Sequence, residues 1–337
     1  MTERRSRSAR SATLTLLVAL LLPACVAGLF RSPEKPRTRY LLENPPASAD
    51  LVGRLSFRET KTEDTLIDLA PEIGAGYVEL LAANPGIDPW LPPKGTRLVV
   101  PAARLLPSGP REGIVVNVGD LRLYYFAKGA PVRSYPIGIA KDGYATPLGV
   151  TTVRAKRENP TWVPGESARR DDPKLAARVE PGPDNPLGSH ALYLGWPTYL
   201  IHGTNDPRGV GRHSSRGCIR LYPAHIAELY ALVAPGTKVR VVNEPVKLGW
   251  IGGELYLEVN PNAEHSLELD ETGKLPASPV SREVRAQVSR AAGKHAPRID
   301  WPKVDAIARS RFGIPSRITG TAPAPAPAQA PAQARSR

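Results

Sequence analysis

Proline and glycine are dense along this chain, and they limit what it can fold into. There are 37 prolines and 29 glycines among 337 residues. Proline removes an amide donor and blocks a helix interior, and glycine adds conformational entropy that a helix must lose. A bundle of long helices is therefore excluded. We expect a mainly β fold with short helices, and the 41% of hydrophobic residues suffices for a packed core.

The positive charge is concentrated at the two ends of the chain. The formal net charge is +13, yet eleven Lys and Arg residues stand against three acids between Ser281 and Arg337. The first ten residues add four arginines against one acid. The region between them is nearly neutral, and aromatic residues are sparse at 6%. We expect no nucleic-acid partner, although the basic ends suit contact with anionic lipid or cell-wall polymer.

The N-terminus has the pattern of an export signal. A basic stretch, Arg4 to Arg10, precedes an uncharged, leucine-rich run from Ser11 to Phe30. This predicts a secretory or lipoprotein signal over residues 1–27, with a membrane-anchoring helix as the alternative. Leu22-Pro23-Ala24-Cys25 resembles a lipobox, which makes Cys25 a lipidation candidate. We expect location in the periplasm or cell envelope, with membrane attachment only through a lipid or an uncleaved N-terminal segment.

Composition and periodicity divide the remaining chain into successive segments. Apolar spacing of period two or 3.6 marks the folded parts, and Pro-rich or Ala/Pro-rich stretches mark the connecting and terminal parts. The expected organisation is a linker over 28–50, a small β-α-α-β unit over 51–101, a β-rich domain over 113–243, a basic C-terminal extension over 244–319 and a disordered tail over 320–337.

Within the β-rich domain, turn signals locate a hairpin, a helix and a loop. Gly119-Asp120 lies between two β-prone runs and predicts a hairpin turn. Residues Pro223 to Val233 form the one clear helix of this domain, with proline in its first turn. Residues 157–189 are polar and rich in Pro and Gly, which predicts a long loop serving as a lid or binding wall.

Cys218 and His202 are the residues best suited to nucleophilic chemistry. A thiol attacks as its thiolate and needs a base or cation nearby, commonly a histidine. His202 lies sixteen residues before Cys218, at the end of a predicted strand. Arg216 and Arg220 flank the cysteine and are expected to lower its pKa, and Gly217 removes side-chain bulk beside it.

Two other interpretations of these residues compete with catalysis. A lone cysteine is often an inert buried thiol, but an Arg- and Gly-rich polar loop is a poor place for a core residue. A metal site would need His202, His213, Cys218 and His225, whose spacings match none of the usual close-pair zinc patterns. We therefore expect no metal and no cofactor.

The 51–101 unit resembles a LysM module. The matching stretches are Glu63-Asp64-Thr65-Leu66, Ala83-Asn84-Pro85-Gly86 and Gly95 to Pro101. The resemblance implies binding to glycans that contain N-acetylglucosamine. A purely structural packing unit is the alternative.

The β-rich domain resembles the L,D-transpeptidases of the YkuD/ErfK type. Their signature is His-Gly followed by Ser-x-Gly-Cys-Ile/Val-Arg, and here His202-Gly203 precedes Ser215-Arg216-Gly217-Cys218-Ile219-Arg220. Thr146 to Gly149, Asn159 to Trp162 and Pro181 to Gly188 are similar to further family segments. The family often has a second histidine at the position of Arg216.

The resemblance implies an acyltransferase that acts on peptidoglycan stem peptides. Cys218 would attack the third residue of a tetrapeptide and expel D-alanine, with His202 as the base. Backbone amides of Gly217 and Cys218 would hold the oxyanion. Arg220 would orient the substrate carboxylate, and Gly203, Ser215 and Arg216 would support the site.

The acyl acceptor and the activity itself have alternatives. The acceptor is an amine of a neighbouring strand, a lysine of a cell-wall-anchored lipoprotein, or water, in which case the enzyme is an L,D-carboxypeptidase. A non-catalytic wall-binding protein would use the LysM-like unit and the basic tail instead. The intact His202 and Cys218 argue against that last alternative.

Overall fold

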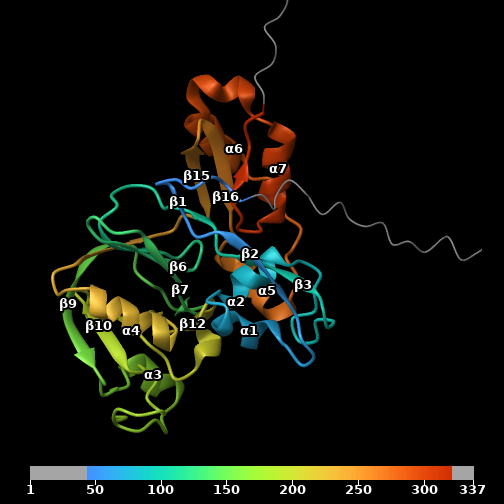
Figure 1. Ribbon diagram of the computed structural model, residues 1–337. Helices are drawn as coiled ribbons and strands as arrows, with labels where there is room; N and C mark the ends of the chain where they lie inside the picture. The colour runs from blue at the N-terminus through green and yellow to red at the C-terminus, as the bar shows by residue number, and fades with distance from the viewer. Residues whose placement is uncertain (1–43, 321–337) are drawn as a thin grey trace, which may run out of the picture. The chain divides into compact units, whose positions relative to one another are not determined.

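The computed structural model in Figure 1 describes residues 44–320. The predicted signal over 1–27, its Cys25, most of the 28–50 linker and nearly all of the 320–337 tail lie outside the described residues. Within 44–320, no helix is long and apolar enough to cross a membrane. The described residues are β-rich with short helices, as the Pro and Gly content predicts.

An eight-stranded sheet forms the centre of the predicted 113–243 region, in the order β13-β11-β10-β9-β14-β5-β6-β7. Most neighbours are antiparallel, whereas β11–β13 and β5–β14 are parallel. Strand β14 alternates buried valines with more exposed residues, which suits a half-buried pleated surface. The strands are β5 (Gly113–Asn117), β6 (Arg122–Phe126), β7 (Arg133–Pro136), β9 (Gly149–Glu158), β10 (His190–Leu194), β11 (Leu200–His202), β13 (Ile219–Arg220) and β14 (Lys238–Val242).

The predicted hairpin is present, but its turn is longer than two residues. Strands β5 and β6 pair from Gly113↔Phe126 to Asn117↔Arg122, which leaves four residues between them. Side chains stabilise this turn, because Asn117 accepts from the Gly119 amide and Asp120 accepts from the Arg122 amide. Leu121 adopts a left-handed backbone, with φ 54°.

The region over 157–189 contains more structure than a loop. Strand β9 continues to Glu158, helix α3 (Glu166–Asp171) follows, and Trp162 pairs with Val179 in an isolated bridge. The predicted helix over 223–233 is confirmed as α4 (Pro223–Leu232), with proline in its first turn and Ile226 and Leu229 buried. It packs against β10 (Figure 1).

The expected β-α-α-β order is present before the large sheet. Strands β2 (Leu55–Glu59) and β3 (Arg97–Pro101) pair antiparallel, and helices α1 (Leu66–Glu72) and α2 (Tyr77–Ala83) lie between them in the chain. All seven residues of α2 are buried. Its apolar side chains share one hydrophobic core with the large sheet, so these helices pack as part of the same body.

Two short strand pairs complete this part of the chain. Strand β1 (Leu51–Val52) pairs with β4 (Arg104–Leu105). Strand β8 (Ile139–Ala140) pairs in parallel with β12 (His213–Ser215), which lies in the segment between His202 and Cys218.

The predicted C-terminal extension is a folded unit with its own hydrophobic core. Val284, Val288 and Ala292 have helical spacing and form the buried face of α6. Asn262 and Asp300 accept hydrogen bonds from the first turns of α5 and α7, a capping pattern that starts a helix. The elements are β15 (Val246–Ile251), β16 (Glu254–Val259), α5 (Ala263–Thr272), α6 (Arg282–Ala292), α7 (Trp301–Ser310) and β17 (Ser316–Arg317).

A buried lysine connects this extension to the large sheet. Lys247 on β15 contacts Asp120 at 2.6 Å and Glu258 at 2.9 Å, and all three side chains are at most 1% exposed. Its ammonium also donates to the Tyr124 hydroxyl at 2.9 Å and to the Leu105 carbonyl at 2.8 Å. Every donor of the ammonium is therefore used, which such a desolvated charge requires.

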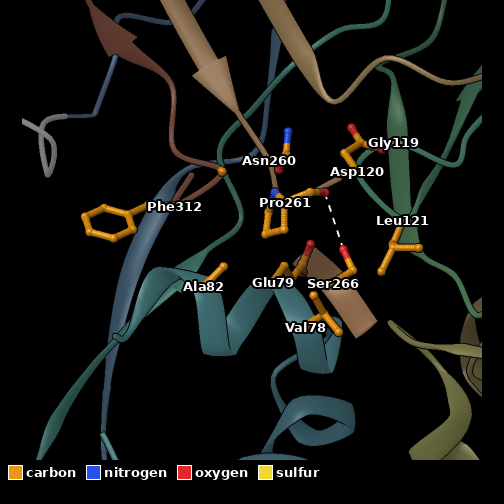
Figure 2. Close-up of a pocket in the computed structure, with 11 residues that line it drawn as sticks. Val78, Glu79, Ala82, Gly119, Asp120, Leu121, Asn260, Pro261, Ser266 and Phe312 are labelled. Atoms are coloured by element: carbon orange, nitrogen blue, oxygen red, sulfur yellow. Dashed lines mark hydrogen bonds between the residues drawn. The ribbon is translucent and has the colours of Figure 1, made fainter. Parts of the chain in front are cut away.

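A second buried ion cluster lies beside α2. Glu79 contacts Arg104 at 2.7 Å and Arg122 at 3.2 Å, and the paired guanidiniums hold the pKa of Glu79 below its usual value despite burial. Figure 2 shows the small pocket that adjoins it, which Glu79 and Asp120 both line and where Ser266 donates to the Pro261 carbonyl. Neither Cys218 nor His202 lines this pocket.

We expect Lys247→Met to lower the free energy of unfolding by about 3–5 kcal/mol, because two buried carboxylates lose their counter-ion. Lys238→Met is the matched control, since Lys238 is 63% exposed and pairs with the exposed Glu112. Its expected effect is at most about 1 kcal/mol. Denaturant unfolding of the two variants measures the difference, and equal losses would show that burial of the Lys247 cluster is not what stabilises this junction.

Candidate active site

Strand register places the Cys218 and His202 side chains on one face of the sheet. In the parallel pair β11–β13, Ile201 lies opposite Ile219 and His202 lies opposite Arg220. Because side chains alternate along a strand, Cys218, Arg220 and His202 share a face. Ile201 and Ile219 point the other way and are buried. Residues sixteen apart in sequence are thus brought to the same face of neighbouring strands.

The backbone of residues 198–200 surrounds the thiol. The thiol of Cys218 donates to the Thr198 carbonyl at 3.5 Å, and Thr198 has a left-handed backbone with φ 69°. That conformation is rare for a β-branched residue and marks a strained position, of the kind often found at functional sites. No sequence pattern singles out Thr198.

Burial raises the pKa of the Cys218 thiol above its usual value, and it outweighs the opposing effects of the Leu200 amide and the Arg220 charge. The expectation that arginine charge lowers this pKa is confirmed for Arg220, whereas Arg216 is not among the causes. Arg220 does favour the thiolate, but the loss of solvent around the sulfur is the larger effect.

His202 is a buried, neutral imidazole with a defined tautomer. Its Nδ1–H donates to the Gly203 carbonyl at 2.6 Å, which leaves Nε2 as the proton acceptor. Burial, with a smaller effect of Arg220, lowers the pKa of His202 to about 4, although the Gly203 and Leu187 carbonyls oppose this shift. The Cys218 thiol is hydrogen-bonded to Thr198 and not to this imidazole in the described residues. The resting pair is therefore uncharged.

The segment before Cys218 is held by its own hydrogen bonds. The Ser215 hydroxyl donates to the Cys218 carbonyl at 2.6 Å and accepts from the Gly217 amide at 3.1 Å. The Thr146 hydroxyl donates to the Gly217 carbonyl at 3.0 Å. The Gly217 amide is thus already engaged, in contrast to its expected role as a free oxyanion donor.

Gly217 is required by its backbone and by its neighbours. Its φ is +121°, and a Cβ there would lie 2.8 Å from the Tyr199 ring and 2.9 Å from the Ala145 carbonyl oxygen. Tyr199 and Ala145 fill the space where a side chain at position 217 would lie, so the glycine does not open space for a substrate there. Gly203 is similarly close to its neighbours, since a Cβ would lie 3.0 Å from Ile226 and 3.2 Å from the Leu187 carbonyl oxygen.

Asn185 organises the end of the 157–189 region, next to His202. It is fully buried, its amide donates to the carbonyls of Pro160, Val179 and Glu180, and its oxygen accepts from the Leu187 amide at 2.9 Å. All of these partners lie within residues 157–189, so Asn185 joins the two ends of the region to each other. Asn185 lies in a stretch that the sequence marks as family-like, yet no pattern indicates this bonding role.

Arg216 and Arg220 differ in their surroundings. Arg220 is partly buried on the Cys218 face, and its charge acts on both Cys218 and His202. Arg216 is exposed, and its Nε donates to Asp171 of α3 at 2.9 Å. Arg216 is not among the charges that shift the pKa of the thiol, and its Nε is paired with a carboxylate 45 residues earlier in the chain.

The histidines considered for a metal site make separate contacts. The Nδ1–H of His213 donates to the Ala140 carbonyl at 3.0 Å, and the His225 ring makes tilted or edge-on contacts with the rings of Tyr135 and Tyr222. Within residues 44–320, no group of three His, Cys, Asp or Glu side chains is arranged to hold a metal ion.

The segment that joins His202 to Cys218 packs against α1 and α2. Its 3₁₀ turn, η2 (Pro207–Gly209), contributes Arg208, which pairs with Asp68 of α1 at 2.9 Å. The Val78 amide of α2 donates to the Gly211 carbonyl at 3.1 Å. Arg212 contacts Asp270 of α5 at 2.8 Å. Three helices thus support the segment that carries the site.

We expect Gly211→Ala to destabilise the chain by at least about 2 kcal/mol and to lower activity, because the backbone is both strained and crowded. Its φ is +77°, and a Cβ would lie 2.3 Å from the Gly76 Cα and the Tyr77 nitrogen. Gly86→Ala is the control, because its φ is +80° with nothing within 4 Å. Thermal unfolding and steady-state rates of both variants separate the effect of the close contact with Gly76 and Tyr77 from the effect of backbone strain. Equal losses of stability and activity in the two variants would show that the contact has no role.

Comparison with known proteins identifies the class of this domain. Residues 111–241 match the YkuD family model, the L,D-transpeptidase catalytic domain. The Escherichia coli K12 protein named probable L,D-transpeptidase YcfS is 42% identical over 246 residues, covering 70% of this chain and 73% of that protein. The E. coli K12 protein named probable L,D-transpeptidase ErfK/SrfK is 39% identical over 286 residues, covering 82% and 89%.

The matched domain makes this chain an acyltransferase. More narrowly, it belongs to the L,D-transpeptidase family, together with relatives of the ErfK and YcfS kinds.

Proposed function

We propose that this protein is a peptidoglycan L,D-transpeptidase in which Cys218 is the nucleophile and His202 the general base. The observation that carries this proposal is the β11–β13 register, which puts the two side chains on one face inside the family-matched domain. Cys218 is the free cysteine of the described residues.

The first half of the reaction forms a thioester. The thiol loses its proton to Nε2 of His202, and the sulfur attacks the carbonyl carbon of the third residue of a stem tetrapeptide. The tetrahedral intermediate collapses with cleavage of the peptide bond, and the imidazolium returns the proton to the leaving amine of D-alanine. Because the resting pair is neutral, proton transfer accompanies attack and does not precede it.

The surrounding groups suit the charges that develop. The Cys218 amide supplies an oxyanion donor next to the nucleophile, and the Gly217 amide joins it when it exchanges its bond with Ser215. Arg220 lies on the same face as the thiol and orients the carboxylate of the donor. Thr198, Gly203, Ser215 and Asn185 hold the backbone in place.

The second half of the reaction transfers the acyl group. His202 removes a proton from an acceptor amine, which attacks the thioester and releases the thiol. The acceptor is an amine of a neighbouring stem peptide or a lysine of a cell-wall-anchored lipoprotein. With water as the acceptor, the same residues give L,D-carboxypeptidase activity.

The cellular setting follows from the N-terminal pattern and the module. We place the protein in the periplasm or cell envelope, exported by residues 1–27, with lipidation of Cys25 as the means of attachment. The β-α-α-β unit over 51–101 is proposed as a LysM-like glycan-binding module, and its order of elements supports this. Glycan binding would hold the catalytic domain near its substrate.

Product analysis tests the proposed function. Purified protein is incubated with a stem tetrapeptide, with and without a second stem peptide as amine donor, and the products are separated by mass spectrometry. Crosslinked dimer plus free D-alanine supports transpeptidation, and tripeptide plus D-alanine supports the carboxypeptidase alternative. Absence of D-alanine in both mixtures, with no labelling of Cys218 by a carbapenem, would leave the non-catalytic wall-binding protein as the correct description.

A further inference from the structure

Arg216 has unused hydrogen-bond donors beside the nucleophile. Its Nε is engaged with Asp171, but within residues 44–320 neither terminal nitrogen makes a hydrogen bond to the protein. Its side chain is 34% exposed, so these N–H groups face solvent. A planar guanidinium with both terminal nitrogens open is suited to binding a carboxylate in two-point fashion.

Asp171 orients this guanidinium but does not cancel all of the positive charge around it. The Tyr144 hydroxyl donates to the same Asp171 oxygen at 2.8 Å, and the Lys141 ammonium lies 3.6 Å from it. Two cations therefore share one carboxylate, which leaves one positive charge at this position. The hydrogen bond from Tyr144 and the bond from Arg216 hold the pKa of Asp171 below its usual value, so the carboxylate stays ionised.

This cluster lies next to Cys218 in the chain and contacts the backbone of Gly217. Arg216 is two residues before Cys218, and the 141–146 segment that supplies Lys141 and Tyr144 also contacts Gly217 through Thr146. Arg220 is close enough that the Arg216 charge lowers its pKa. One partly buried and one exposed arginine therefore lie near the nucleophile, an arrangement that complements a donor peptide with two carboxylates.

We propose that Arg216, oriented by Asp171, binds a free side-chain carboxylate on the third residue of the donor peptide. The enzyme then selects stem peptides whose third residue carries a free, unamidated side-chain carboxylate. This rests on the proposed function, in which Arg220 serves the carboxylate nearer the scissile bond. Arg216 is a specificity-determining residue in this account, and the base remains His202.

A matched pair of substrates tests this proposal. Two tetrapeptides differ only at the side-chain carboxyl of residue three, free in one and a carboxamide in the other, and kcat and KM are measured for D-alanine release. We expect the intact enzyme to prefer the free acid by about 10- to 100-fold in kcat/KM, mostly through KM. The preference should shrink as salt is raised, because the site is exposed.

Variants locate the preference. Arg216→Gln should bring the two kcat/KM values to within about 2-fold, chiefly by weakening the free acid, and Arg216→Lys should recover only part of the difference. Arg178→Gln is the control, because Arg178 is an exposed arginine of the same 157–189 region, paired with Glu180. That variant should keep the full preference.

The outcomes separate the two proposals. If the enzyme releases D-alanine from both peptides and Arg216→Gln slows both equally, the preference is unchanged and this inference is wrong while the proposed function stands. An enzyme that prefers the carboxamide also overturns it. If the intact enzyme releases D-alanine from neither peptide, the proposed function fails and the inference falls with it.

Discussion

Cys218→Ala is expected to abolish D-alanine release from a stem tetrapeptide, with no rate above that of a reaction without enzyme. The thiol is the nucleophile in our account, and Cys218 is the free cysteine of the described residues. The fold should tolerate the change, because the side chain is only partly buried and its hydrogen bonds are with the backbone at Thr198 and Leu200 only. D-alanine is measured by mass spectrometry and folding by thermal unfolding.

Cys218→Ser is the matched variant. It keeps the size of the side chain but replaces the thiol with a far weaker nucleophile, so we expect a rate close to that of the alanine variant. Crosslinking by a well-folded Cys218→Ala protein would show that another group attacks the substrate.

The second large effect is expected at His202. Replacing this base with alanine should lower kcat by about 10²- to 10⁴-fold. His202→Gln is the sharper variant, because an amide can still donate to the Gly203 carbonyl but cannot accept the thiol proton. A similar loss in both variants supports base catalysis. Near-normal activity of the glutamine variant would show that His202 serves only to hold the structure.

The pH dependence follows from the neutral resting pair. With the pKa of His202 at about 4, the imidazole can accept a proton at any pH above that value, so kcat/KM should fall only as pH drops through about 4. The Cys218 thiol has a raised pKa, so its alkylation should accelerate only in the alkaline range. A thiol already reactive at mildly acidic pH would indicate a thiolate–imidazolium pair instead.

The same histidine affects stability. Its pKa of about 4 in the folded chain lies below the usual value of 6.5, so the unfolded chain takes up the proton first as pH falls. Stability is therefore complete above about 6.5 and is lost as pH falls towards 4. His213, His225 and His265 shift in the same direction, so only the difference between the intact protein and His202→Gln isolates this contribution.

Sequence patterns predicted the elements that depend on turn residues and on the spacing of apolar residues within a short segment. The helix at 223–232 follows from a proline in its first turn and from apolar spacing. The β-α-α-β order of the first unit was predicted in the same way. The helices α3, α5 and α7 were not predicted, because they are short and polar and depend on caps and packing for their stability.

The candidate site was predictable where chemistry and spacing coincide. Cys218 stands out because a cysteine has few other roles in a polar loop, and His202 because it is followed by glycine at the end of a predicted strand. The partners of Arg216 and Lys247 were not predictable, since Asp171 and Asp120 are far away in sequence and only the fold brings them together. The expected effect of Arg216 on the thiol pKa failed for this reason.

The most direct test of the central claim is the mass of the intact protein after rapid mixing with a stem tetrapeptide and acid quenching. Our account predicts a species heavier by the tetrapeptide less D-alanine, carried by a thioester that peptide mapping places on Cys218 and that hydroxylamine removes. Two results would contradict this account. One is release of D-alanine with no such species in either the intact protein or the His202→Gln variant, and the other is an adduct on any other residue.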